Sequence, residues 1–350
     1  MVNGSFHNKL VLIFFKKKYL TLMNKRSLGS TNFEVSEIGF GAWQIGADWG
    51  VEVPIDTALE SLSAAADAGV NFIDTADVYG AGRSEKIIGE FIQGRDDEII
   101  VATKMGRATS DWNDSYDEIS KAAELSCKRL GVESLDLVQL HCIPEQTLKG
   151  LKVFENLEKI KEQGLIKNYG VSVETIDEGL FCIENSATTS LQVIFNIFRQ
   201  KVATDLLEKA ASNNVGIIAR VPLASGLLSG KFSKDHQFAE TDHRKFNADG
   251  QLFNVGETFA GVPFEVALEF VDEIESILNE ELLEASLAQK SLRWILDHEQ
   301  VSTVIPGATT VEQASQNAEV SKFASLSKEA HLKLNSLYID QIDSNVRGRY

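Results

Sequence analysis

Four polar residues in the first half of the chain follow apolar runs, and together they could transfer a proton. Asp74 and Tyr79 lie in the stretch Asn-Phe-Ile-Asp-Thr-Ala-Asp-Val-Tyr-Gly at 71–80, while Lys104 and His141 end two later apolar runs. A tyrosine has an unperturbed pKa of about 10, and we expect a neighbouring ammonium to lower the pKa of Tyr79. Asp74 would hold Lys104 charged and oriented. Tyr79 could then donate a proton to a carbonyl oxygen that His141 helps to position.

Each of these residues also has an ordinary structural explanation. A tyrosine after a strand is usually part of the surface or the core, and an aspartate can cap a helix. A lysine is often a solvated charge, and a histidine at a strand end often makes only structural hydrogen bonds. Their placement at the ends of consecutive apolar runs favours a functional site, a redox site that needs a soluble hydride carrier.

The elements that must position these residues are short strands alternating with amphipathic helices. Apolar runs rich in Ile, Val and Leu predict parallel strands at 37–40, 72–74, 99–102, 135–140, 166–171, 191–197, 216–220 and 301–305. Apolar residues at three- and four-residue spacing predict helices at 55–68, 116–130, 148–163, 203–213 and 281–298. We predict left-handed helix caps at Gly69, Gly131, Gly164 and Gly216. The alternation predicts an α/β fold, a single (β/α)8 TIM barrel.

Composition limits the class of protein. The chain has 350 residues, 43% of them hydrophobic, and a formal net charge of −17, which argues against a nucleic-acid or anionic-membrane surface. The 3 cysteines fit a reducing, cytoplasmic setting, and their spacing predicts no metal site. Residues 1–22 contain an apolar run too short to span a bilayer, and we interpret them as a disordered extension or a misassigned start. The domain would then be 23–350.

An irregular segment at 232–263 interrupts the alternation after the seventh predicted strand. It is dotted with Gly and Asp and has weak periodicity. A loop at that place would lie on the C-terminal face, where barrel enzymes bind ligands, either as a passive insertion or as a substrate lid. Other pocket residues are expected in loops that contain Trp43, Trp49 and residues 107–112, and we take Trp43 as the candidate for the substrate pocket.

Ordered motifs from residue 26 to about 342 resemble the aldo-keto reductase superfamily. Leu-Gly-Ser-Thr at 28–31 and Val-Ser-Glu-Ile-Gly-Phe-Gly at 35–41 resemble its N-terminal hairpin and first strand. Asp-Thr-Ala-x-x-Tyr-Gly at 74–80, Thr-Lys at 103–104 and the leucine-rich run ending at His141 resemble its catalytic segments. Gly-Val-Ser at 170–172, Leu-Ala-Ser-Gly-Leu-Leu-Ser-Gly-Lys at 223–231 and Ile-Pro-Gly-Ala at 305–308 resemble its cofactor segments.

The resemblance implies a barrel with an N-terminal β-hairpin that binds NADPH without a Rossmann domain and reduces aldehydes or ketones to alcohols. Tyr79 would be the proton donor, supported by Lys104, Asp74 and His141. The cofactor residues that it implies are Ser172 and Gln192 at the nicotinamide carboxamide, Arg220 against the nicotinamide, Ser225, Gly226, Leu228 and Lys231 over the pyrophosphate, and Gly307, Gln313 and Asn317 towards the adenosine. The expected partner is a small carbonyl compound, with no nucleic acid or membrane, and the oligomeric state stays open.

Three departures from the family pattern concern the cofactor. Val173 stands where many relatives have Asn. Arg220 stands where relatives commonly place an aromatic ring, and its guanidinium could either stack on the nicotinamide or turn into a salt bridge. The segment after Gly307 lacks the cations that often bind the 2′-phosphate, so Arg244 or Lys231 would have to supply one, and NADH is not excluded.

Two other readings compete with a reductase. The chain could be a cofactor-binding, redox-sensing regulatory subunit with little turnover, like the aldo-keto reductase-like β subunits of potassium channels. It could also be a barrel of another chemistry, such as an isomerase. Membership of a family does not identify the substrate.

Overall fold

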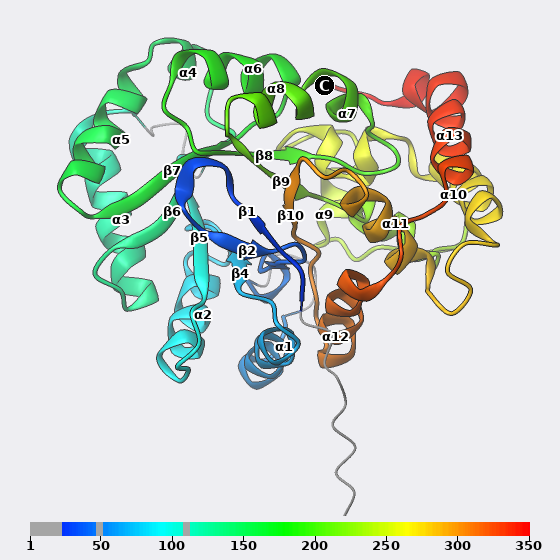
Figure 1. Ribbon diagram of the computed structural model, residues 1–350, viewed down its shortest axis with the longest axis horizontal. Helices are drawn as coiled ribbons and strands as arrows, with labels where there is room; N and C mark the ends of the chain where they lie inside the picture. The colour runs from blue at the N-terminus through cyan, green and yellow to red at the C-terminus, as the bar shows by residue number, and fades with distance from the viewer. Residues whose placement is uncertain (1–22, 47–51, 108–112) are drawn as a thin grey trace, which may run out of the picture.

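Eight parallel strands form the central sheet of this computed structural model, which describes residues 23–46, 52–107 and 113–350 (Figure 1). The predictions for residues 1–22, Trp49 and residues 108–112 lie outside the described residues. The sheet strands are β3 (Phe40–Gly41), β4 (Phe72–Asp74), β5 (Ile100–Met105), β6 (Leu135–His141), β7 (Ile166–Ser172), β8 (Ser190–Ile194), β9 (Gly216–Arg220) and β10 (Val301–Val304). Each strand pairs with its neighbour in chain order, as in a (β/α)8 fold.

The sheet closes on itself between β3 and β10. The Gly39 N–H donates to the Val304 carbonyl at 2.8 Å, and the Gly41 N–H donates to the Pro306 carbonyl at 3.0 Å. A Cβ at Gly41 would lie 2.7 Å from the Ile305 carbonyl oxygen, so only glycine permits this close approach. The predicted barrel is confirmed.

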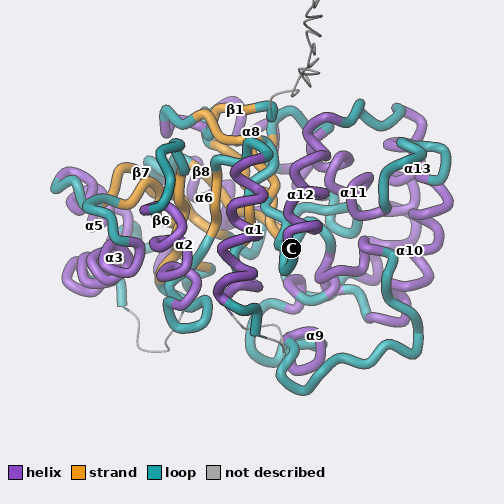
Figure 2. The backbone as a smooth tube through the Cα atoms, turned by 90° about the horizontal axis from the view of Figure 1, so that it is seen from below, coloured by secondary structure: helices purple, strands orange, loops and turns teal. Residues whose placement is uncertain are grey.

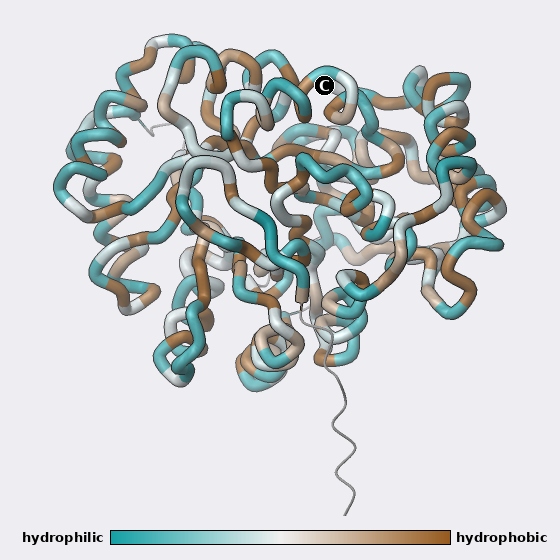
Figure 3. Tube along the Cα trace, in the orientation of Figure 1, coloured by the Kyte–Doolittle hydropathy of each residue, from teal (hydrophilic) through white to brown (hydrophobic). Residues whose placement is uncertain are grey.

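Helices surround the sheet, and along each of them hydrophilic and hydrophobic residues alternate (Figure 3). They are α1 (Ile55–Asp67), α2 (Arg83–Gln93), α3 (Tyr116–Leu130), α4 (Glu145–Lys149), α5 (Lys152–Glu162), α6 (Ile176–Asn185), α7 (Lys201–Asp205), α8 (Leu207–Ser212), α9 (His243–Phe246), α10 (Phe264–Leu278), α11 (Leu287–Leu296), α12 (Val311–Glu319) and α13 (Lys328–Leu337). This arrangement covers the outer face of each strand, which explains why most strand residues are apolar and nearly all of them are buried.

Several predicted helix boundaries were wrong. The predicted helix at 148–163 divides into α4 and α5, because Leu151 adopts a left-handed conformation with φ of 61°. The predicted helix at 203–213 likewise divides, into α7 and α8. The predicted helix at 281–298 begins only at Leu287, where Ser286 and Gln289 form a capping box.

Three of the four predicted glycine caps have the expected left-handed conformation. Gly69, Gly131 and Gly164 have positive φ values, but Gly216 does not, and instead begins β9. Asn214 takes the left-handed position there, with φ of 53°. Apart from glycine, asparagine is one of the residues that best tolerate this conformation. The left-handed residue therefore lies two positions before the predicted one.

An antiparallel hairpin of β1 (Lys25–Ser27) and β2 (Glu34–Ser36) covers one end of the barrel. Figure 2 shows β1 at that end and α9 at the opposite end. Side chains of the hairpin and of the strands form a buried cluster, which includes Leu28, Val35, Phe72 and Leu137. The predicted N-terminal hairpin is therefore confirmed, and it leaves the other end of the barrel for the site.

Among the described residues, no helix combines the length and the apolar character that a crossing of a bilayer requires.

Candidate active site

The strand ends bring three of the four predicted residues to one edge of the sheet. Asp74 is the last residue of β4, Lys104 lies one residue before the end of β5, and His141 ends β6. The strands are parallel, so their carboxyl ends meet at the same face of the barrel. Tyr79 follows on the loop after β4, and its ring lies 6.0 Å from the His141 ring, edge to face.

Lys104 connects the carboxylate to the phenol. Its Nζ lies 2.6 Å from Asp74 Oδ2, 2.9 Å from the Thr75 carbonyl oxygen and 3.2 Å from Tyr79 Oη. The Lys104 side chain is 1% exposed, so this is a buried ion pair. Burial lowers the pKa of Lys104, but Asp74 and then Tyr79 more than offset burial and raise the pKa above its ordinary value. Asp74 thus holds Lys104 charged, as the sequence predicted.

The predicted lowering of the Tyr79 pKa was wrong. Burial raises the pKa of the Tyr79 phenol above its ordinary value, and the charge of Lys104 offsets burial only in part. Desolvation of the phenolate outweighs one ammonium that is itself shared with Asp74. Tyr79 is therefore held protonated, the state in which it can donate.

His141 is neutral in this site. Burial, followed by the charges of Arg107, Lys104 and Arg220, lowers the pKa of His141 well below its ordinary value. Its Nε2 lies 3.1 Å from Arg107 Nη1. Among the described residues, no partner satisfies its buried Nδ1.

Two glutamines hold the second oxygen of Asp74. Asp74 Oδ1 accepts from Gln192 Nε2 at 2.7 Å and from Gln139 Nε2 at 3.1 Å. Gln192 was predicted as a cofactor residue; its amide nitrogen donates to Asp74, and the residue also lines the cavity described below. Sequence reasoning missed Gln139, although a buried amide two residues before His141 on an apolar strand is a usable signal.

Glu257 bridges two arginines beside the catalytic group. Its Oε2 lies 2.9 Å from Arg107 Nη2, and its Oε1 lies 3.0 Å from Arg220 Nη1. Burial raises the pKa of Glu257, but Arg107 and Arg220 outweigh burial and bring it to about 2. Arg220 therefore forms a salt bridge, which is one of the two arrangements that the sequence left open for it. Glu257 itself lies in the irregular segment at 232–263, where no periodicity indicates which side chains turn inward.

Cys142, Glu174 and Glu257 place potential ligand atoms within 4.8 Å of one another. Both Glu257 oxygens already accept from arginine, and Arg220 Nη2 also lies 3.6 Å from Cys142 Sγ. Guanidinium groups at this distance favour an ion-pair cluster over a cation site.

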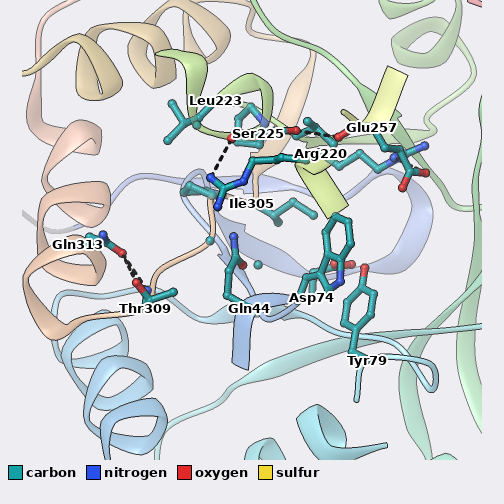
Figure 4. Close-up of a pocket in the computed structure, with 18 of the residues that line it drawn as sticks. Gln44, Asp74, Tyr79, Arg220, Leu223, Ser225, Glu257, Ile305, Thr309 and Gln313 are labelled. Carbon is teal, nitrogen blue, oxygen red and sulfur yellow. Dashed lines mark hydrogen bonds and ion pairs between the residues drawn. The ribbon is translucent and has the colours of Figure 1, made fainter. Parts of the chain in front are cut away.

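A cavity of about 970 Å³ begins at these strand ends and extends to α12. Figure 4 shows Asp74 and Tyr79 at one side of the cavity and Thr309 and Gln313 at the other. The predicted site residues that line the cavity are Trp43, Asp74, Tyr79, His141, Gln192, Arg220, Ser225, Gly226, Lys231, Gly307, Gln313 and Asn317. The structure thus brings together most of the predicted catalytic and cofactor residues.

Two predicted cofactor residues do not line the cavity. Ser172 is buried, with its Oγ 3.7 Å from Cys142 Sγ, and Leu228 is buried with its N–H donating to the Leu223 carbonyl. Ser225 does line the cavity, but its hydroxyl donates to the Glu257 carbonyl and accepts from the Phe259 N–H. Ser225 therefore ties the β9 segment to the 232–263 segment.

The backbone after β9 is strained where it passes the cavity. Val221, Ala224, Ser225 and Gly226 all have positive φ, between 48° and 95°. A β-branched residue such as Val221 is a genuine outlier in this region, and strain of this kind concentrates at ligand-binding sites. At Gly226, with φ of 95°, glycine is the residue that adopts the conformation without cost.

Neutral groups form the far end of the cavity. Gln313 Oε1 accepts from the Thr309 N–H at 2.8 Å and from Thr309 Oγ1 at 3.0 Å, and Asn317 donates to the Gly307 carbonyl. Arg244 also lines the cavity, but it is ion-paired with Asp242. Lys231 is exposed, and none of the ion pairs among the described residues involves it.

Aromatic rings cover the catalytic end. The Trp43 ring stacks on Tyr79 at 6.0 Å with an interplanar angle of 17°, and the Phe253 ring lies 6.2 Å from Trp43. Phe253 belongs to the 232–263 segment, which also contributes Phe232, Phe246 and Leu252 to the lining. The segment lies on the C-terminal face, as predicted, and it builds a wall of the cavity, which excludes a merely passive insertion.

The cavity fits a nicotinamide dinucleotide. It is elongated, with polar groups at both ends, and Arg220 Nε is buried in its wall without a partner among the described residues. Arg220 and Tyr79 both line the cavity. The residues that would hold such a cofactor are Gln192, Arg220, Gly226, Lys231 and Gln313.

Comparison with known proteins defines the class. A model of the aldo/keto reductase family matches residues 37–339, so the chain belongs to the aldo/keto reductase family. The predicted family and the predicted reductase class of enzyme are thereby confirmed. Among solved structures, glycerol dehydrogenase AKR11B4 of Gluconobacter oxydans superimposes with a TM-score of 0.75 at 26% identity, over 94% of this chain and 99% of that chain.

Three curated relatives are similar over most of their length. The uncharacterized oxidoreductase YqkF of Bacillus subtilis is 29% identical over 90% of this chain and 96% of its own length. A probable voltage-gated potassium channel subunit beta of Oryza sativa is 29% identical over 84% of this chain and 90% of its own length. The aldo-keto reductase yakc [NADP(+)] of Schizosaccharomyces pombe is 30% identical over 82% of this chain and 84% of its own length. The relatives therefore include both an NADP(+)-named reductase and a channel subunit.

Proposed function

We propose that this protein reduces a small aldehyde or ketone to the alcohol with NADPH, and that Tyr79 donates the proton. The observation that carries the proposal is the chain of contacts from Asp74 Oδ2 through Lys104 Nζ, at 2.6 Å, to Tyr79 Oη, at 3.2 Å. NADPH is supported by membership of the family and by the NADP(+) in the name of the yeast relative.

When bound, NADPH would supply the hydride that reduces the carbonyl carbon. Negative charge then develops on the carbonyl oxygen, and the Tyr79 hydroxyl hydrogen-bonds to that oxygen and transfers its proton. Lys104 lies 3.2 Å from the phenol oxygen and stabilises the phenolate that remains. The Trp43 and Phe253 rings limit the access of water to this end of the cavity.

Steady-state consumption of NADPH with a panel of aldehydes and ketones tests the proposal. We expect multiple turnovers, with the alcohol as product in equal amount to the NADPH consumed. Tight binding of NADPH without turnover on any member of the panel would contradict the proposal.

That contrary result would favour a redox-sensing regulatory subunit. The observation in favour of this second function is the similarity to a potassium channel subunit beta of rice. The complete set of Asp74, Lys104 and His141 at the carboxyl ends of the strands, with Tyr79 on the loop after β4, supports turnover instead. We also propose a cytoplasmic location, on the three unpaired cysteines alone.

A further inference from the structure

Two arginines at the catalytic end share a single carboxylate. Arg107 binds Glu257 through both oxygens, with Nη1 3.1 Å from Oε1 and Nη2 2.9 Å from Oε2. Arg220 reaches only one of these oxygens, with its Nη1 3.0 Å from Oε1. No other ion pair within residues 23–46, 52–107 and 113–350 involves either arginine. Arg107 and Glu257 thus form a complete pair, and the charge of Arg220 is in excess.

The other groups that contact Arg220 do not neutralise it. Its Nη2 lies 3.6 Å from Cys142 Sγ and 3.3 Å from the Val173 carbonyl oxygen. Burial raises the pKa of the Cys142 thiol above its ordinary value, so the thiol is uncharged at neutral pH. Arg220 Nε is buried and has no partner among the described residues. Arg220 therefore places a positive charge in the cavity wall that the described residues do not neutralise.

Two further charged residues beside this cluster cancel each other. Glu174 places a carboxylate oxygen within 4.8 Å of Glu257 and of Cys142. Arg199 is buried next to the same cluster, since a Cβ on Gly256 would lie 2.5 Å from its guanidinium carbon. Burial lowers the pKa of Arg199 to about 10, which leaves it charged at neutral pH. One added anion and one added cation leave the net charge of the cluster positive.

The excess charge acts at the end of the cavity where the reaction takes place. Arg107 Nη1 lies 3.1 Å from His141 Nε2, and the His141 ring lies 6.0 Å from the Tyr79 ring. Burial lowers the pKa of His141, and the charges of three nearby cations, Arg220 among them, lower it further. The field of Arg220 therefore extends to the residues that surround the reacting carbonyl.

The two redox forms of the coenzyme differ in charge at this same end. A nicotinamide that transfers hydride to a carbonyl next to Tyr79 must lie at the catalytic end of the cavity. Its oxidised ring carries a positive charge, and its reduced ring is neutral. The phosphates carry the same charge in both forms, so their interactions cancel when the two forms are compared. An excess positive charge in a largely buried site therefore disfavours the oxidised form.

We propose that Arg220 makes this protein bind NADPH in preference to NADP+. This inference rests on the reductase function proposed above and adds a residue that selects the redox state of the coenzyme. Glu257 limits the effect, because it neutralises one of the two guanidinium groups. When both forms are present, the free protein takes up the reduced coenzyme, and NADP+ leaves readily after the reaction.

Isothermal titration calorimetry without substrate measures the dissociation constants of the two forms. For the wild type we expect Kd for NADP+ to exceed Kd for NADPH by at least about tenfold. In Arg220→Met we expect this ratio to fall to within about threefold of unity. Arg107 still binds both oxygens of Glu257 in that variant, so no carboxylate is left unpaired. Arg220→Lys keeps the charge and should keep most of the ratio.

Glu257→Gln tests the sign of the effect. It removes the negative charge that the two arginines share, so we expect the ratio to rise above that of the wild type by about threefold or more. A residue that only maintains the shape of the cavity would affect the binding of both forms alike. Lys231→Met removes a cation at the far end, and we expect it to change both dissociation constants by the same factor.

Three results would overturn the inference. They are a wild-type ratio near unity, an Arg220→Met variant that keeps the wild-type ratio, and a Glu257→Gln variant in which the ratio falls. Thermal unfolding establishes that each variant is folded. If Glu257→Gln does not fold, Glu174→Gln replaces it, with a smaller rise expected. If Arg220→Met does not fold, Arg220→Gln replaces it, with the same ratio expected.

The same titrations separate this inference from the proposed function. A wild type that binds neither form of the coenzyme would contradict the proposed function. Equal binding of both forms would contradict only the role of Arg220.

Discussion

The two ends of the cavity differ in how they hold charge. At the catalytic end, Lys104 is paired with Asp74, and Arg107 and Arg220 share Glu257, all in largely buried positions. At the far end, Thr309 and Gln313 are neutral, and the cation Lys231 is exposed. Buried charges must be paired and rigidly placed, whereas exposed groups exchange partners with water at little cost.

This difference explains which property each end controls. The residues of the catalytic end lie at strand termini, so their geometry depends on the whole barrel. The residues of the far end lie in the segment after β9 and in the first turn of α12. Single substitutions there change contacts without disturbing the sheet. We therefore expect reaction chemistry to depend on the first end and coenzyme preference on the second.

Lys104→Met should have the largest effect on stability and activity together. It leaves Asp74 buried and unpaired, so we expect the free energy of unfolding to fall by about 3–5 kcal/mol. We also expect kcat to fall by about 10²–10⁴-fold, because the phenolate of Tyr79 loses its counter-charge. Urea unfolding and steady-state rates measure the two effects. Lys231→Met, at the other end, serves as the control, and equal destabilisation by both substitutions would break the comparison.

Glu257→Gln tests the buried pairing through pH. The pKa of Glu257 is about 2 in the folded protein, below the ordinary value of 4.5. A carboxyl with a lowered folded pKa contributes stability above its unfolded pKa and loses it as pH falls through the folded pKa. We expect the free energy of unfolding of the wild type to fall between about pH 4.5 and about pH 2, by on the order of 3 kcal/mol from this group.

The free energy of unfolding of Glu257→Gln should fall less than that of the wild type over the same pH range. Urea unfolding at a series of pH values, with wild type and Glu257→Gln compared at each, isolates the contribution of this carboxyl. Parallel curves would mean that Glu257 is not an ionised partner of the two arginines.

Lys231→Met should affect coenzyme preference. If Lys231 binds the 2′-phosphate, its loss raises KM for NADPH by about 3–10-fold at low salt and leaves KM for NADH nearly unchanged. Lys234→Met is the matched control, since Lys234 pairs with Glu269 on the exposed surface. An equal change in KM for both coenzymes would place the phosphate elsewhere.

Gln313→Ala should have the smallest effect. Its Oε1 accepts from the Thr309 N–H and hydroxyl, but both groups are partly exposed, and water can replace the lost acceptor. We expect less than about 1 kcal/mol of destabilisation and about a twofold rise in KM for either coenzyme. A loss comparable to that of Lys104→Met would show that the far end is as rigid as the catalytic end.

Local patterns were sufficient to predict the barrel and the positions of Asp74, Lys104 and His141. Short apolar runs identify parallel strands, and polar residues at their ends converge because parallel strands share one carboxyl edge. Boundaries within helical segments were less reliable. A left-handed residue such as Leu151 interrupts α4 and α5 without any change in the hydrophobic pattern.

The partners of Arg107 and Arg220 could not be predicted. Glu257 lies 150 residues after Arg107 in a segment without periodicity, so only the folded chain brings them together. The pKa of Tyr79 was mispredicted for a related reason. The opposing effects of burial and of Lys104 depend on how completely Trp43 and its neighbours cover the phenol, which no spacing of residues reports.

A comparison of Tyr79→Phe with the wild type tests the central claim most directly. The substitution removes only the hydroxyl 3.2 Å from Lys104 Nζ and keeps the ring that stacks on Trp43. With an aldehyde that the wild type reduces, we expect kcat to fall by about 10²–10⁴-fold while the dissociation constant of NADPH stays within about twofold. A variant that binds NADPH and retains wild-type turnover would contradict the assignment of Tyr79 as the proton donor.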